Sequence, residues 1–289
     1  MKYSSPSAFR DAIDQNLRNR KYTKGSNISR LRKRIAFERF IVRLMVASDK
    51  KWILKGGTVL EFRYPFQARA TQDIDLALND KAVDDVEALR SLLVRSLARD
   101  LENDWFEFGV KFDRELSKDE EGIKGWRFMI SVGLAGTDFV SPFPLDIVLR
   151  SDEIVGTGTV KLVNSLSFAD LGQPEYYLDS IDRNQHFAEK IHAITRNYGT
   201  ARTNSRVKDL VDCIIFIEDD LDPSLELKKT CEHVFESRGT HKIKDQIELP
   251  TNWKDSYETQ AEELQLDTQT FREATRILAE FWRVTIDNL

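Results

Sequence analysis

The chain has 289 residues, of which 41% are hydrophobic and 31% charged, and its formal net charge is −5. This composition is typical of a globular protein with a substantial core, and no apolar run approaches the roughly 18 residues needed to span a bilayer. The N-terminus lacks the apolar core of a signal peptide, so we expect a cytoplasmic protein without a membrane partner, and reduced thiols at Cys213 and Cys231.

The first third of the chain predicts two helices and the start of a sheet. Apolar residues recur at helical spacing over residues 7–17 and 28–47, ahead of a short apolar stretch that ends in Lys55. The glycine pair Gly56 and Gly57 follows, and a helix is expected to begin there with Thr58 as its N-cap. Residues 71–78, Thr-Gln-Asp-Ile-Asp-Leu-Ala-Leu, then predict a strand, and residues 83–101 predict a helix.

The remaining elements predict a mixed sheet followed by helices. Alternation of period two predicts strands over residues 106–112 and 127–132, joined by a polar connection at 113–124. A turn is expected at 138–142, before a third strand at 143–149. Amphipathic helices are expected at 181–197, 207–219, 225–238 and 268–287, with a loop at 239–257. We therefore predict an α/β (α+β) fold, with a mixed-sheet domain at residues 1–165 and a mainly helical C-terminal domain at 166–289 that completes the same cleft.

Three aspartates in the predicted strands carry most of the information about function. Asp73 and Asp75 are two residues apart in one strand, so their side chains point to the same face. Two like charges this close repel, and a divalent cation with oxygen ligands offsets them at neutral pH. Asp146, between apolar residues of the third strand, is a candidate to complete a metal site. The upstream glycine pair suits a phosphate, although a plain loop accounts for such a pair as well.

The order of these motifs resembles a known family. Gly-Gly-Thr, then Asp-x-Asp, then a third carboxylate on a separate strand resembles the nucleotidyltransferase fold of the DNA polymerase beta superfamily. Residues 54–58 (Leu-Lys-Gly-Gly-Thr), 69–75 (Arg-Ala-Thr-Gln-Asp-Ile-Asp), 188–193 (Ala-Glu-Lys-Ile-His-Ala) and 208–212 (Lys-Asp-Leu-Val-Asp) resemble the successive motifs of the AbiEii family. These are toxins of type IV toxin–antitoxin systems, and the MenT-type tRNA nucleotidyltransferase toxins are similar to them.

The resemblance implies a polymerase-beta-like nucleotidyltransferase that uses Mg²⁺, in a two-metal arrangement, to transfer a nucleotide from an NTP to an RNA 3′ end. The tRNA acceptor stem is the implied acceptor, and a cognate antitoxin is the implied partner. Metal ligation falls to Asp73, Asp75 and Asp146, which are also catalytic together with Lys190 and Asp212. The residues implied in nucleotide binding are Lys55, Gly56, Gly57, Thr58, Arg69, Thr71 and Asp209.

From the residues alone, several alternatives stay open. Lys190 fits a solvated helix surface, Lys208 and Asp212 fit an i,i+4 ion pair, and His192 fits a core histidine. The acid-free basic stretches at residues 17–36 and 190–208 are candidate RNA contacts, although acids elsewhere in the fold can balance the first of them. A metal-dependent RNase and a nucleotide-binding toxin without transfer activity are the competing functions.

Overall fold

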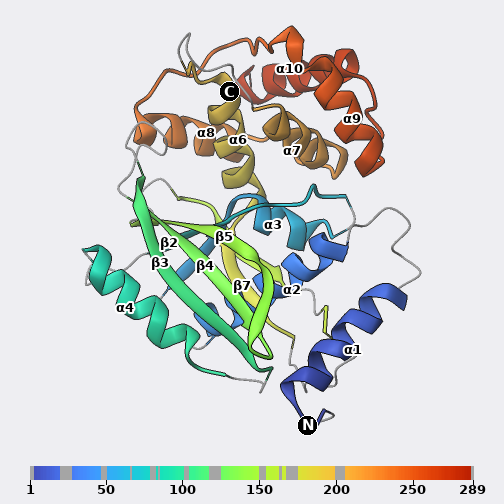
Figure 1. The fold of residues 1–289 in the computed structure, drawn as a ribbon. Helices are drawn as coiled ribbons and strands as arrows, with labels where there is room; N and C mark the ends of the chain where they lie inside the picture. Colours follow the sequence, from blue (N-terminus) through green and yellow to red (C-terminus); the bar gives the residue numbers. More distant parts are fainter. Residues whose placement is uncertain are drawn as a thin grey trace.

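The computed structural model describes residues 3–19, 28–46, 51–65, 67–78, 83, 85–100, 104–116, 125–149, 154–162, 165–166, 175–198 and 206–287. Within these ranges a mixed sheet is flanked by helices, and the helices of the second half of the chain gather at one end of it (Figure 1). The predicted α/β class with a mixed sheet is therefore confirmed. No helix of the described ranges combines the length and apolar character that crossing a bilayer requires.

The described strands form one sheet in the order β3-β4-β5-β2-β1-β7-β6. In its centre, β2 pairs antiparallel with β1 and parallel with β5. The strands are β1 (Trp52–Lys55), β2 (Ile74–Leu78), β3 (Phe106–Leu116), β4 (Gly125–Leu134), β5 (Thr137–Leu149), β6 (Thr157–Lys161) and β7 (Tyr177–Ile181). The helices are α1 (Pro6–Asn19), α2 (Ile28–Ile41) with its π-helical continuation η2 (Val42–Val46), α3 (Gly56–Arg63), α4 (Val86–Leu97), α6 (Arg183–Thr195), α7 (Val207–Glu218), α8 (Leu225–Arg238), the 3₁₀ turn η4 (Thr251–Trp253), α9 (Lys254–Leu264) and α10 (Phe271–Asp287).

The alternation of residues along the strands separates an apolar face of the sheet from a charged one. Ile74, Leu76 and Leu78 of β2 are buried on one face, in a cluster with α1, α2 and α4 that we call the sheet core. Side chains at i and i+2 of a strand share a face, so Asp75 projects from the opposite side. The same alternation in β5 buries Leu145 and leaves its neighbour Asp146 on the charged face.

Helices α6 to α10 surround a second cluster, the helical core, to which α3 contributes Leu60. Cys213 and Cys231 are buried in this core as free thiols, as predicted. The sheet continues past the domain boundary predicted at residue 165, because β7 pairs with both β1 and β6. The helical part begins only at α6, where the N-cap Asp182 accepts a hydrogen bond from the backbone of Gln185 at 2.8 Å.

The start of α3 differs from the prediction. Lys55, not Thr58, is the N-cap residue, because Gly56 takes a φ of +63° and lets the helix begin directly after β1. Thr58 lies in the first turn, where its hydroxyl donates to the carbonyl of Asp73 at 3.1 Å. This bond ties α3 to the segment that leads into β2.

Three connections also differ from the prediction. The turn expected at 138–142 is part of β5, because the chain already reverses at Ala135 and Gly136, whose φ values of 57° and 72° are typical of a tight hairpin turn. The connection expected at 113–124 starts later, since β3 continues to Leu116, and residues 117–124 lie outside the described ranges. The loop expected at 239–257 contains η4 and the first turn of α9, which packs against α7.

A buried ion cluster fixes the end of α2 and η2 against the segment before β3. Asp104 is 2% exposed, pairs with Arg43, and lies 3.8 Å from Nη1 of Arg39. It also accepts a hydrogen bond from the backbone N–H of Phe106 at 3.0 Å. The carboxylate therefore compensates two buried guanidinium groups, of which Arg43 also lies 3.6 Å from Asp100.

Replacing Asp104 with alanine is expected to lower the free energy of unfolding by about 3 kcal/mol, because breaking a buried ion pair leaves uncompensated charge. Urea denaturation followed by circular dichroism measures this loss. The control Asp138→Ala removes an exposed carboxylate and should change stability by less than about 0.5 kcal/mol. A loss for Asp104→Ala no larger than that of the control would contradict the assigned role of the cluster.

Candidate active site

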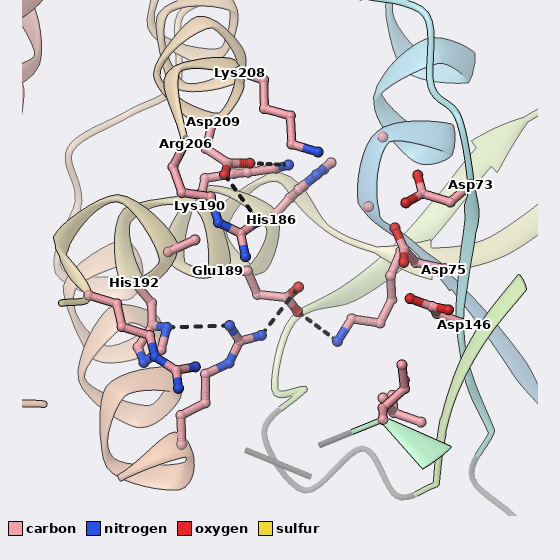
Figure 2. Close-up of a pocket in the computed structure, with 18 of the residues that line it drawn as sticks. Asp73, Asp75, Asp146, His186, Glu189, Lys190, His192, Arg206, Lys208 and Asp209 are labelled. Atoms are coloured by element: carbon pink, nitrogen blue, oxygen red, sulfur yellow. Dashed lines mark hydrogen bonds and ion pairs between the residues drawn. The ribbon is translucent and has the colours of Figure 1, made fainter. Parts of the chain in front are cut away.

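A cleft of about 860 Å³ lies between the charged face of the sheet and helices α6 and α7. Asp73, Asp75 and Asp146 line the sheet wall, while Glu189 and Lys190 face them from the helical wall (Figure 2). The structure therefore brings the three aspartates singled out from the sequence into one cleft. Their catalytic and metal-binding roles remain predictions.

Strand register explains why these side chains meet. In the pairing of β2 with its neighbours, Asp75 lies directly opposite both Asp146 and Lys55. On the far side of Asp146, β4 places Arg127 opposite it, and β3 places Arg114 opposite Arg127. We call this line across five adjacent strands the charged row: Arg114, Arg127, Asp146, Asp75 and Lys55. Residues opposite one another in register project from the same face, and all five line the cleft.

Arg127 binds Asp146 with two parallel hydrogen bonds. Its Nε and Nη2 atoms donate to Oδ1 and Oδ2 of Asp146, each at 2.6 Å. The hydrogen-bonded carboxylate raises the pKa of Arg127 further above its ordinary value, so the guanidinium stays charged. Both oxygens of Asp146 are therefore engaged, whereas Asp73 accepts a hydrogen bond from the hydroxyl of Thr71 at 3.2 Å.

The carboxylates of the sheet wall have the chemistry that suits a divalent cation. Carboxylate oxygens are the ligands that Mg²⁺ prefers. The strand predicted at 71–78 begins only at Ile74, so Asp73 lies just before β2 and Asp75 within it, and both line the cleft. Within the described ranges, no group of three or more His, Cys, Asp or Glu side chains is arranged to hold a metal ion. The third carboxylate, Asp146, is instead bound by Arg127 through both of its oxygens.

The glycine pair makes room for side chains of the site. A Cβ atom on Gly56 would lie 1.8 Å from Oδ2 of Asp75, and one on Gly57 would lie 2.7 Å from the hydroxyl of Thr71. Any larger residue would therefore displace a neighbour that lines or supports the cleft. Both glycines line the cleft at the N-terminus of α3, where backbone N–H groups and the helix dipole favour a phosphate.

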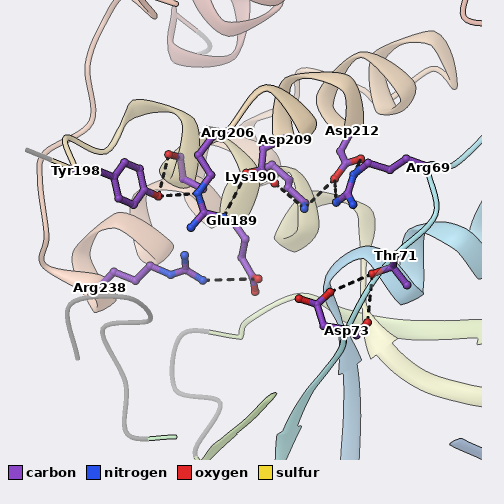
Figure 3. A network of polar contacts seen from close by, with 11 residues as sticks. Arg69, Thr71, Asp73, Glu189, Lys190, Tyr198, Arg206, Asp209, Asp212 and Arg238 are labelled. Carbon is purple, nitrogen blue, oxygen red and sulfur yellow. Dashed lines mark hydrogen bonds and ion pairs between the residues drawn. The ribbon is translucent and has the colours of Figure 1, made fainter. Parts of the chain in front are cut away.

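Lys190 lies at the centre of the helical wall and is held by two carboxylates (Figure 3). Its Nζ atom is 2.8 Å from Oδ1 of Asp209 and 2.8 Å from Oδ2 of Asp212. Asp212 also accepts two hydrogen bonds from Arg69, at 3.0 and 2.9 Å. This network joins the segment before β2 to α6 and α7.

The charges of this network stabilise one another. Burial alone would lower the pKa of Lys190, but Asp209 and Asp212 outweigh it and hold that pKa above its ordinary value. Burial alone would raise the pKa of Asp212, but Lys190 and Arg69 hold it well below its ordinary value. Lys190 and Asp212 are therefore both ionised at neutral pH.

The network decides between several sequence-based alternatives. Lys190 is 9% exposed, so it does not lie on a solvated surface. Asp212 pairs with Arg69 and Lys190 instead of Lys208, so the i,i+4 pair does not form. His192 is 1% exposed and hydrogen-bonds with Thr240 at 2.8 Å, as a core histidine would.

Two basic stretches were candidate RNA contacts, and only the second reaches this cleft through described residues. Arg206 lines it, with Arg196 nearby in the same lining. Of the first stretch, Arg32 pairs with Asp14 at 2.6 Å, and Arg30, Lys33 and Arg34 line a separate pocket of about 210 Å³. The described part of the first stretch is therefore largely balanced by acids and local contacts. Residues 20–27 and 199–205 lie outside the described ranges.

The sequence did not indicate the ionic contacts of Glu189. Lys55 Nζ lies 3.2 Å from Oε1 of Glu189, whose other oxygen lies 3.6 Å from Nη2 of Arg238. Arg238 ends α8, far from the other motifs along the chain. Arg127 was assigned to a strand by alternation, but its partner depends on the strand register, which one sequence does not reveal.

Asp212→Asn is expected to lower the free energy of unfolding by about 3 kcal/mol at pH 7, because Lys190 and Arg69 lose a buried anion. The pKa of Asp212 is held below its unfolded value of about 3.9, so its contribution is fully present above that pH and is lost as the pH falls further. Urea denaturation of both proteins between pH 7 and pH 2.5 should therefore show a difference that narrows in acid. The exposed Asp287→Asn should show a small difference at every pH; a pH-independent difference for Asp212→Asn would contradict the assignment.

Comparisons with known proteins agree with the motifs. A sequence profile of the family described as Nucleotidyl transferase AbiEii toxin, Type IV TA system, matches residues 39–283. No curated protein has a significant match to the chain. Among solved structures, MenT4, a nucleotidyltransferase toxin from Mycobacterium tuberculosis H37Rv, is 14% identical with a TM-score of 0.54, and the match covers 96% of this chain and 88% of MenT4. JHP933 from Helicobacter pylori is 13% identical with a TM-score of 0.43, covering 88% of this chain and 92% of JHP933.

The structural match to MenT4 and the match to the family profile support different conclusions. The likeness to MenT4 concerns the fold alone, because the identity is low. The profile match covers most of the chain and includes all four motif segments read from the sequence. The chain therefore belongs to the AbiEii family of nucleotidyltransferase toxins from type IV toxin–antitoxin systems.

Proposed function

We propose that the protein transfers a nucleoside monophosphate from an NTP to the 3′ hydroxyl of an RNA, and that this RNA is tRNA, so that the altered acceptor stem blocks translation. Besides the family, the observation that carries the proposal is the charge of the cleft. Of the described residues that line it, nine are Lys or Arg and five are Asp or Glu, whereas the whole chain has a net charge of −5. A basic cleft in an acidic protein favours a polyanionic ligand.

In the proposed reaction, the RNA 3′ oxygen attacks the α-phosphorus of the NTP while the bond from that phosphorus to the pyrophosphate oxygen breaks. Pyrophosphate leaves, and the hydroxyl proton passes to solvent. Such a displacement depends on positioning and on neutralising charge, and it requires no protein nucleophile.

The residues of the helical wall and of α3 have separate tasks in this reaction. The N-terminus of α3, at Gly56 and Gly57, binds phosphate oxygens through backbone N–H groups. Lys190 neutralises charge on the departing phosphates, and Asp212 keeps its ammonium group in place through the 2.8 Å contact. Arg69 holds Asp212 in turn, at 3.0 and 2.9 Å.

Asp73 and Asp75 are the residues that would hold Mg²⁺, with Asp146 as a further ligand in a two-metal arrangement. Bound Mg²⁺ supplies positive charge at the triphosphate and lowers the pKa of the attacking hydroxyl. An activity that consumes NTPs and tRNA belongs in the cytoplasm, and a type IV toxin has a cognate antitoxin as its functional partner.

Incubation of the purified protein with total tRNA, Mg²⁺ and each α-labelled NTP in turn should label tRNA with one or a few nucleotides. Asp73→Ala and Asp75→Ala should each reduce labelling by at least about 10³-fold, because the carboxylates that hold the metal are lost. Circular dichroism spectra of both variants should match that of the unmodified protein. Asp179→Ala, an exposed aspartate of β7 outside the cleft, is the matched control and should label normally.

Each other outcome of this assay contradicts the proposal in a distinct way. Full labelling by Asp73→Ala refutes the assigned carboxylate. Shortened RNA without any NTP requirement identifies a metal-dependent RNase. Tight NTP binding without labelling of any RNA identifies a nucleotide-binding toxin that does not transfer.

Substitution of Lys208 tests whether tRNA binds at the rim of the cleft. Lys208 is exposed at the rim, and it has no hydrogen bond or ion pair within the described part of the chain (Figure 2). Lys208→Gln should therefore weaken tRNA binding and reduce the slope of log K against log salt by about 1, as expected for one lost phosphate contact. Filter binding at several salt concentrations measures both quantities. Lys254→Gln, an exposed lysine at the start of α9, should leave the slope unchanged.

A further inference from the structure

The proposed reaction assigns no task to Arg127, although it makes the most direct contact in the sheet wall. Its two nitrogens each lie 2.6 Å from an oxygen of Asp146. Asp146 is in register with Asp75, so the contact lies beside the carboxylates that are proposed to hold the metal. A bidentate guanidinium uses one lone pair on each carboxylate oxygen and adds a positive charge beside them, so it competes with a metal ion for the same carboxylate.

We infer that Arg127 takes the place of a metal ion on Asp146 and competes with that ion for the oxygens of this carboxylate. Arg127 is thus a positioning residue that sets the affinity of the site for divalent cations. The inference rests on the proposed metal-dependent function and adds to it a competitor built into the sheet.

The register of the sheet gives the reason for such a competitor. Asp75 and Asp146 lie directly opposite one another, and like charges in this position destabilise a strand pair. In the absence of a metal, the guanidinium of Arg127 offsets this repulsion. A divalent cation bound between the carboxylates offsets it as well, so one cation can replace the other without leaving the aspartates uncompensated.

The exposure of the pair makes the exchange accessible. The side chain of Arg127 is 26% exposed, whereas that of Asp146 is 9% exposed. A partly solvated ion pair is weaker than a fully buried one, because water screens the charges and receives the released guanidinium. Arg127 already lines the cleft that would receive a triphosphate, and a guanidinium binds phosphate oxygens in the same two-armed manner.

Mn²⁺ binding, measured by electron paramagnetic resonance of the free ion in the absence of NTP and RNA, tests the inference. Arg127→Gln should bind Mn²⁺ about tenfold more tightly than the unmodified protein, because Asp146 becomes available as an oxygen ligand. Arg127→Lys, which keeps the charge without the two-armed contact, should give a smaller gain and guards against a folding defect in the first variant. Asp146→Asn should weaken binding markedly in the Arg127→Gln background and little in the unmodified protein.

Arg114→Gln is the matched control, since it removes the same charge from the neighbouring position of the charged row. Arg114 forms an ion pair with Asp113, at 3.9 Å. Arg114→Gln should change the Mn²⁺ affinity by less than about twofold, because salt and water screen the effect of a partly exposed charge on the site. Equal gains for Arg114→Gln and Arg127→Gln would overturn the inference, because general charge would then account for both.

Two further results also overturn it, and they separate it from the proposed function. Unchanged or weaker Mn²⁺ binding by both Arg127 variants would show that Arg127 does not compete with the metal. The proposed metal site at Asp73 and Asp75 would still stand. Absence of Mn²⁺ binding by the unmodified protein and by Arg127→Gln removes the metal from the proposed function as well.

Discussion

The repulsion between Asp75 and Asp146, which lie directly opposite one another in two parallel strands, sets the arrangement of the cleft. The charged row answers it within the sheet by placing Arg127 and Lys55 on either side of the two aspartates. The helical wall is arranged in the same way, because the buried charge of Asp212 is offset by ion pairs with Lys190 and Arg69. In the proposed function, a triphosphate or a metal ion would therefore bind this cleft by exchanging partners with groups that are already paired.

The aspartates depend for their position on the apolar face of the same strands. Leu76 and Ile147, the residues that follow Asp75 and Asp146, are in register with each other and buried in the sheet core. A shift of one residue in either strand would place carboxylates in that core, at a cost of several kcal/mol per charge. The apolar core thus fixes the register, and the register fixes the separation of the carboxylates.

The sequence predicts well whatever depends on local pattern. The bounds of α8 follow from its helical periodicity, its Ser224 N-cap and Gly239, which takes the left-handed conformation that ends the helix. The motif order likewise indicates the family and places the three aspartates in one cleft. Local sequence pattern does not predict structure that depends on backbone conformation or strand register. At Ala135 and Gly136, for example, two positive φ values form the hairpin turn ahead of the position predicted for it. The contact of Arg127 with Asp146 depends on a strand pairing that neither strand encodes alone.

α3 packs into both cores and so couples the two walls of the cleft. Its Val59 and Phe62 are buried in the sheet core, while Leu60 is buried in the helical core. A helix whose successive residues belong to both cores cannot move with one wall without disturbing the packing of the other. The N-terminus of this same helix, at Gly56, lines the cleft and meets Asp75 so closely that a Cβ atom there would lie 1.8 Å from its Oδ2. If a phosphate binds at the start of α3 as proposed, any shift of the helix would therefore reach both the carboxylates of the sheet and the helical core.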